Sequence, residues 1–226
     1  MALKVVLDNR TVYFHVVRRK KQKRLIFYAL EDNVYKVTTP TKMSQKTIEY
    51  TIQANLEKIL ELKPRIDIKK AVIEAKKVPV FNELYDREYF SETSVQETLK
   101  AIFRKEVEFL VQRFSRLDPS LDLHSVKFRV QYMTSKFGSC QPHKRRITLN
   151  LELIHYPKQM LESIFAHEIA HLKHPNHSAA YYRYLSTLMP NHKALKKQLN
   201  GWHKTLVFEG FDALINVTNN EISSII

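Results

Sequence analysis

A cluster of histidines at residues 167–177 is the part of the chain whose residue types could do chemistry. The segment reads His-Glu-Ile-Ala-His-Leu-Lys-His-Pro-Asn-His and holds four of the ten histidines. Residues four apart in a helix lie on one face, so His167 and His171 can direct two imidazoles at one point. Glu168 lies about 100° further round the helix, where a carboxylate can take a proton from water beside an ion. The spacing therefore predicts a divalent-metal site with Glu168 as a base.

A third protein ligand is needed, because a catalytic zinc site usually has three and keeps the fourth position for water or substrate. We expect His177 to be that ligand. A continuous helix would carry position 177 roughly 9 Å along the axis from His171, too far to share an ion. Pro175 disfavours helix at the residue before it, so the helix should end near His174 and let His177 fold back. His174 is the alternative third ligand.

Three further segments match a known pattern: Thr-Ser-Lys-Phe-Gly-Ser-Cys at 134–140, Ile-Thr-Leu-Asn-Leu-Glu-Leu-Ile at 147–154 and Ser-Ala-Ala-Tyr-Tyr at 178–182. With residues 167–177 they resemble the YgjP-like metallopeptidase domain, a family similar in its core to SprT-like and WLM proteases. The resemblance covers most of the chain. It implies a zincin-like core, peptide hydrolysis, metal ligands at His167, His171 and His177, and Glu168 as the catalytic acid–base. Phe137 stands where the family more often has tryptophan.

The expected cofactor is Zn²⁺, although three imidazoles accept several divalent ions. A peptide or protein is the expected substrate. Three side chains are candidates for contacts with the substrate or with a developing oxyanion: Tyr181, Tyr182 and Arg145. Packing is the alternative role for each tyrosine, and a solvated charge is the alternative for Arg145. The single cysteine, Cys140, excludes an internal disulfide, and we expect a buried, inert thiol.

The composition is that of a basic globular chain. Its 226 residues are 44% hydrophobic, and neither a run of eighteen apolar residues nor a signal-type N-terminus is present, so we expect a cytoplasmic protein without membrane contact. The formal net charge of +14 favours a polyanionic partner, whereas a solvated basic surface is the alternative. A metal-dependent nucleotide pyrophosphohydrolase is therefore a second function that the same site would serve.

Six cations fall within seven residues: Arg18, Arg19, Lys20, Lys21, Lys23 and Arg24. At the tip of a hairpin this segment would be a mobile basic finger that contacts phosphates and brings a protease to substrates bound to DNA or RNA. A solvated loop is the alternative. Without interleaved aromatic residues, the segment does not predict base recognition.

Hydrophobic periodicity predicts an α+β fold. Residues 1–40 contain four short β-type runs, with Asp8-Asn9 as a turn, and predict a small antiparallel sheet. One helix should run from Ser44 to Lys63, and the capping box Ser94–Glu97 should open a partner helix that ends at Leu117.

The strands expected at 126–132 and 147–153 should form an antiparallel hairpin before the metal helix, whose edge can pair with an extended substrate. Gly138 lies between them and should mark a positive φ or the close approach of another chain. We expect an N-terminal β-rich subdomain with one helix at 1–91, a zincin-like catalytic domain at 92–207 and a C-terminal tail at 208–226.

Overall fold

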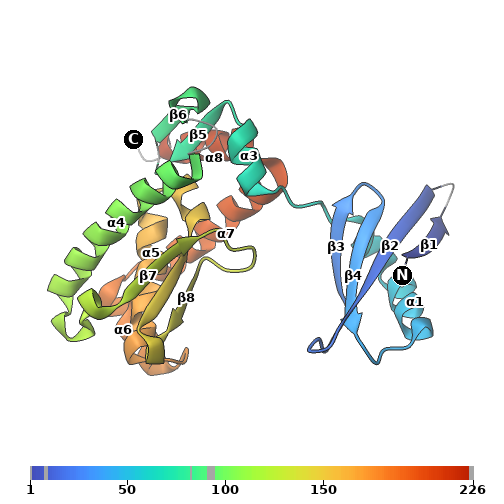
Figure 1. Cartoon of the computed structure of the whole chain (residues 1–226), viewed down its shortest axis with the longest axis horizontal. Helices are drawn as coiled ribbons and strands as arrows, with labels where there is room; N and C mark the ends of the chain where they lie inside the picture. The colour runs from blue at the N-terminus through green and yellow to red at the C-terminus, as the bar shows by residue number, and fades with distance from the viewer. Residues whose placement is uncertain (1, 8–9, 82, 91–94, 224–226) are drawn as a thin grey trace. The chain divides into compact units, whose positions relative to one another are not determined.

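The computed structural model describes residues 2–7, 10–81, 83–90 and 95–223. The predicted turn Asp8-Asn9 and the predicted capping residue Ser94 lie outside these residues. The chain divides into two compact units, Met1–Ile66 and Asp67–Ile226. Both combine small sheets with helices, so the α+β class is confirmed (Figure 1). Within the described ranges, no helix has the length and apolar character needed to cross a membrane.

The N-terminal unit contains a four-stranded sheet of order β1-β2-β4-β3, with β1 at Ala2–Leu7, β2 at Arg10–Arg19, β3 at Ile26–Glu31 and β4 at Val34–Pro40. The predicted strands are present, but the sheet is mixed because β2 and β4 run parallel. β4 lies between β2 and β3, so residues 20–25 cross from one strand to the other past β4. The expectation of a hairpin tip there was therefore wrong.

Two short helices follow this sheet, α1 at Gln45–Ala54 and α2 at Leu56–Leu60. The side chain of Ser44 accepts a hydrogen bond from the amide of Thr47, as an N-cap should. The single helix predicted to Lys63 is interrupted at Asn55, which separates α1 from α2. Helix and sheet bury one core, with fully buried side chains from Phe14, Val37 and Ile48.

The second unit carries the remaining elements: α3 (Ile68–Glu74), β5 (Lys77–Val80), β6 (Glu83–Asp86), α4 (Val95–Leu117), β7 (Lys127–Gln131), β8 (Gly138–Gln141), β9 (Arg146–Asn150), α5 (Lys158–Lys173), α6 (Ala179–Leu188), α7 (His192–Glu209) and α8 (Phe211–Ser223). The helix α4 ends where predicted and buries one apolar face, including Leu99, Phe103 and Phe114.

The three-stranded sheet of this unit has the order β7-β9-β8. β7 pairs with β9 in parallel, and β8 pairs with β9 antiparallel. The expected hairpin between 126–132 and 147–153 was therefore wrong, because the antiparallel partner of β9 is the short strand that begins at Gly138. The edge strand next to α5 is β8, and the two elements are in contact.

Along the chain, the boundary between the two units falls between Ile66 and Asp67, whereas the expected boundary was near residue 91. The difference has a packing cause, because Val72, Val78 and Phe90 are buried in the same core as α4 and α5. Phe211 of the expected tail is buried in that core too, so the tail continues the second unit as α8.

Candidate metal centre

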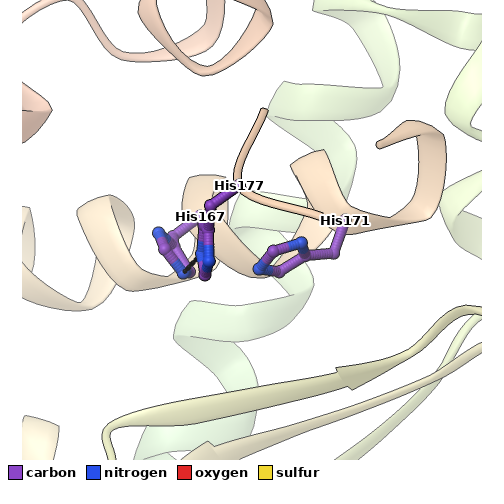
Figure 2. A group of neighbouring side chains, drawn as sticks. All are labelled: His167, His171 and His177. Atoms are coloured by element: carbon purple, nitrogen blue, oxygen red, sulfur yellow. Dashed lines mark hydrogen bonds between the residues drawn. The ribbon is translucent and has the colours of Figure 1, made fainter. Parts of the chain in front are cut away.

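The helix α5 carries three of the four residues predicted to form the site. It begins after Pro157, and one face is anchored in the core by Leu161 and Phe165. His167 and His171 are partly exposed on another side of the helix, one turn apart. Figure 2 shows both imidazoles on the same side of α5, with the ring of His177 beside them.

The chain turns back at the end of α5 and brings His177 to this pair. The helix ends at Lys173, next to His174, where Pro175 was expected to end it. A tight turn follows, in which the amide of Ser178 donates to the carbonyl oxygen of Asn176 at 2.8 Å. The Ser178 side chain then accepts a hydrogen bond from Tyr181 N and begins α6. His177 thus lies on a connection fixed at both ends by helices.

The three imidazoles converge. One nitrogen from each of His167, His171 and His177 lies within 4.8 Å of the other two, and Nε2 of His177 is 3.2 Å from Nε2 of His167. Zinc–nitrogen bonds near 2.1 Å in tetrahedral geometry separate two nitrogen ligands by about 3.4 Å, so small ring rotations are sufficient to hold one ion. The residues present fit a divalent metal with three nitrogen ligands.

The surroundings of His167 and His171 favour the neutral ring that metal ligation requires. Burial, together with the neighbouring His171 and His177, lowers the pKa of His167 to about 3. Burial also lowers the pKa of His171. Nδ1 of His171 lies 3.2 Å from the carbonyl oxygen of His174, and donation there leaves the Nε2 lone pair free for an ion.

His174, the alternative third ligand, lies outside the cluster of three nitrogens. Its ring instead packs edge-on against Tyr184, with the centroids 5.6 Å apart. Its carbonyl oxygen, not its imidazole, serves the site, because it fixes the orientation of the His171 ring.

Glu168 is held against strand β8. Its side chain is 5% exposed, and its carboxylate accepts a hydrogen bond from the amide of Cys140. A Cβ built on Gly138 would lie 2.6 Å from Glu168 Oε1, so the close approach expected at this glycine is made by Glu168 of the same chain. Burial raises the pKa of Glu168 to about 7, while the charge of Lys136 and the Cys140 amide oppose that rise.

Replacing Gly138 with alanine should lower kcat for hydrolysis by roughly a hundredfold, because the added methyl group would displace the Glu168 carboxylate by about 1 Å. The fold should persist, since the clashing atoms are the end of a flexible side chain. Kinetics and thermal unfolding of the variant measure both effects.

Gly201→Ala is the matched control, because nothing lies within 4 Å of a Cβ added at Gly201 in α7. It should retain activity and gain up to about 1 kcal/mol of stability from helix propensity. Full activity in Gly138→Ala would contradict the close packing of Glu168 on β8.

Tyr181 supports two of the histidines. It is fully buried, its hydroxyl donates to the carbonyl oxygen of His167 at 3.1 Å, and its ring stacks on His171 at 4.6 Å. Burial and the nearby Glu168 charge raise its pKa, so the hydroxyl remains a donor. Tyr182 is 43% exposed and stacks on His177.

Arg145 makes structural contacts, and the six basic residues belong to the other unit. Arg145 donates to Ser125 Oγ and to the carbonyl oxygens of Leu121 and Asp122, so these contacts anchor the segment before β7. The segment from Arg18 to Arg24 belongs to the N-terminal unit. Cys140 is partly buried, and burial raises its pKa to about 12, which agrees with the expected inert thiol.

A buried polar network that the sequence did not reveal holds the loop before β8. Asn150 and Glu152 are each 1% exposed, although they alternate with Leu149, Leu151 and Leu153 as residues on the solvated face of a strand do. The Asn150 amide group bonds the backbone of Met133 and the carbonyl oxygen of Lys136. Glu152 accepts from Tyr156 Oη at 2.6 Å and contacts Nδ1 of His203. The burial of these two polar side chains could not be predicted from neighbouring residues, because their hydrogen-bond partners are distant in sequence.

Asp118, at the end of α4, ties together the two helices that flank His177. Its Oδ2 is 2.5 Å from Lys173 Nζ, at the end of α5, and accepts from Tyr184 Oη of α6 at 2.5 Å. The hydrogen bonds from Lys173, Ser120 and Tyr184 lower the pKa of Asp118 well below its usual value.

Asp118→Asn should lower the free energy of unfolding at pH 7 by roughly 2 kcal/mol, as expected for hydrogen bonds to a charged group. Because the folded pKa is depressed, this stabilisation is complete above the unfolded pKa of about 3.9 and is lost as the pH falls toward the folded pKa. The difference in the free energy of unfolding between the parent protein and Asp118→Asn should therefore shrink below about pH 4. Urea unfolding at several pH values measures it.

Glu108→Gln, an exposed carboxylate on α4, is the control and should change stability by less than about 0.5 kcal/mol. If the loss of unfolding free energy in Asp118→Asn stayed constant through acid pH, the assigned ionic contacts of Asp118 would be contradicted.

Comparison with known proteins places the chain in a family. Residues 65–201 match the family described as "YgjP-like, metallopeptidase domain". The match begins two residues before the second unit and contains the three histidines and Glu168. Among solved structures, the chain is similar to the metallopeptidase zymogen abylysin of Pyrococcus abyssi, with 22% identity over 41% of this chain and 90% of that chain and a TM-score of 0.36. No curated protein matches.

The family match covers more than half of the chain and spans every residue that forms the histidine cluster. The chain therefore belongs to the YgjP-like metallopeptidase family.

Proposed function

We propose that the chain is a zinc-dependent peptidase with a zincin-like catalytic core, in which His167, His171 and His177 hold the ion and Glu168 is the general base. The observation that carries this proposal is the convergence of three imidazoles at the helix that also carries the buried Glu168. The family match supports the class of reaction. A zinc ion held there would supply Lewis acidity, which makes water nucleophilic near neutral pH and polarises a scissile carbonyl.

The chain's own residues would then move the protons. An oxygen of the Glu168 carboxylate takes the proton of the attacking water and passes it to the leaving amine. The Cys140 amide holds this carboxylate in place. Tyr181 orients the ligands through the His167 carbonyl group and is a positioning residue. Of the two tyrosines, Tyr182 has the exposed ring and is the candidate for contact with a developing oxyanion.

The outer edge of β8 is the proposed seat of an extended substrate. In an antiparallel pair, alternate residues point their backbone groups to the partner strand. The Phe137 carbonyl oxygen bonds Asn150 of the β9 strand, whereas the Cys140 amide faces Glu168. Gly138 therefore presents its backbone groups on the outer edge, next to Glu168, where a substrate strand can add.

A nucleotide pyrophosphohydrolase is the second candidate function. The charge of Lys136 acts on Glu168, and the charge of Lys196, an exposed residue of α7, acts on His167. Two cations beside a metal centre would also favour a phosphate-bearing substrate.

The test is metal analysis of the purified protein, followed by one screen of a peptide library, casein and nucleoside triphosphates. We expect about one zinc ion for each chain and peptide hydrolysis that a chelator abolishes. Hydrolysis of triphosphates with no cleavage of any peptide would replace the first proposal by the second. Absence of bound metal after zinc loading would overturn both.

A further inference from the structure

The sheet of the N-terminal unit has one covered and one open face. Phe14 of β2 and Val37 of β4 point into the core beneath α1. Along β2, the alternate residues Tyr13, His15 and Val17 are all exposed. Five large apolar side chains of β2 and β3 are each between 37% and 45% exposed: Tyr13, Val17, Ile26, Tyr28 and Leu30. We name the side of the sheet that carries Tyr13, His15, Tyr28 and Lys36 the outer face.

Aromatic rings and cations alternate across the outer face. Register places Lys4 of β1 opposite Tyr13 of β2. In the next row, His15 lies beside Lys36, which lies beside Tyr28. The Lys36 ammonium is 5.0 Å from the centroid of the Tyr28 ring. Tyr13 and Tyr28 are separated by two strand spacings and by two residues along the strands, about 12 Å in all, so they provide two separate stacking positions.

The basic segment continues this face at one end. Arg19 is exposed and follows the alternation of Tyr13 and His15 along β2. The side chain of Gln22 donates to Thr38 Oγ1 at 2.8 Å, which ties the segment to the end of β4. Arg18 is committed to the fold, because its guanidinium donates to two backbone carbonyl oxygens after β4.

The charge of the unit is strongly positive. Residues 1–66 contain 14 lysines and arginines against six aspartates and glutamates. Two of those acids, Glu31 and Asp32, lie at the turn between β3 and β4, at the other end of the strands from the basic segment. The positive charge is thus concentrated where β2 and β4 end.

We propose that the outer face of the N-terminal sheet binds single-stranded nucleic acid, with unpaired bases stacked on Tyr13 and Tyr28 and phosphates paired with Lys36, Arg19 and the basic segment. Base stacking on aromatic side chains combined with a cationic track is the usual basis of such binding. A duplex is disfavoured because its base faces are covered. A second copy of this chain would set cations against cations on this face.

The proposal is independent of the peptidase site. The outer face lies wholly in residues 1–66, and the family match begins at residue 65. The outer face also supplies the aromatic residues that the basic segment does not contain.

The test is fluorescence anisotropy of the full chain with labelled single strands of about 12 nucleotides, both dT and U, and with a duplex of the same length. We expect saturable binding that weakens steeply between about 50 and 200 mM salt. Tyr13→Ala and Tyr28→Ala should each weaken binding by about tenfold or more, as the loss of one stacked base predicts. Tyr28→Phe should bind like the parent protein, because the ring is retained.

Tyr50→Ala is the matched control, since Tyr50 is 73% exposed on α1 of the same unit. Its affinity should stay within about twofold of the parent protein. Circular dichroism and unchanged metal-dependent activity verify that each variant is folded.

Three outcomes would overturn the proposal. The first is no binding of single strands at low salt. The second is charge attraction alone. It would be indicated if Tyr13→Ala and Tyr28→Ala left the affinity for single strands unchanged, or if heparin and the duplex bound as tightly as the single strands. The third is a dimer or adhesion to anionic vesicles that is lost in Tyr28→Ala while oligonucleotides do not bind.

Discussion

Replacing Glu168 with glutamine should lower kcat by roughly 10²- to 10⁴-fold while zinc content stays at the level of the parent protein. Glutamine keeps the size of the side chain and can remain packed against Gly138, but it cannot take a proton from water. The three imidazoles are unchanged in this variant, so an ion should still bind. Turnover of a cleaved peptide and elemental analysis of the same preparation measure the two quantities.

Glu162→Gln is the control for this substitution. Glu162 lies on the same helix and forms an ion pair with Arg113 at 2.6 Å, remote from the chemistry assigned to the site. Its loss should leave kcat within about twofold and cost at most about 1 kcal/mol of stability. Substantial turnover in Glu168→Gln, or equal losses in both variants, would remove Glu168 from the role of general base.

His177→Ala should weaken zinc binding by about a hundredfold or more and abolish hydrolysis under limiting metal. Loss of a residue that only hydrogen-bonds a metal ligand costs about 10- to 100-fold in metal affinity, and loss of a direct ligand should cost at least as much. The fold should persist, because His177 is exposed on a connection whose two ends are held by α5 and α6. Competition with a chromogenic chelator measures the affinity.

His174→Ala is the matched control, three residues away. The substitution removes a ring that packs on Tyr184 but keeps the carbonyl oxygen that orients His171. Zinc affinity should therefore change by less than about tenfold. If His174→Ala lost the metal and His177→Ala kept it, the ligand set would have to be His167, His171 and His174.

Much of the second unit could be predicted because its signals are local. The position of the helix end before Pro175 depends on steric contacts between neighbouring residues, and the pairing of His167 with His171 depends on one helical turn. The Ser178 cap and the apolar face of α4 are local in the same way. The helix end near His174, the pairing of the two histidines and the end of α4 at Leu117 were expected from the sequence, and the structure contains them.

Strand pairing was harder to predict because alternation fixes which face a side chain occupies but not which strand lies beside it. Residues 126–132 and 147–153 have the pattern of a hairpin, yet β7 and β9 run parallel and β8 takes the antiparallel place. Alternation also suggests a solvated face for Asn150 and Glu152. Both are instead buried, Asn150 in contact with the loop before β8 and Glu152 in contact with α7.

The sequence by itself was enough to predict which imidazoles converge, since motif spacing, helix geometry and one proline bring the rings of His167, His171 and His177 close together. Only the tertiary structure decided what supports them. The packing of Glu168 on Gly138, the link from Asp118 to two helices and the open aromatic face of the first sheet join residues far apart in the chain. Such contacts depend on how the elements pack, and no local pattern of residues encodes them.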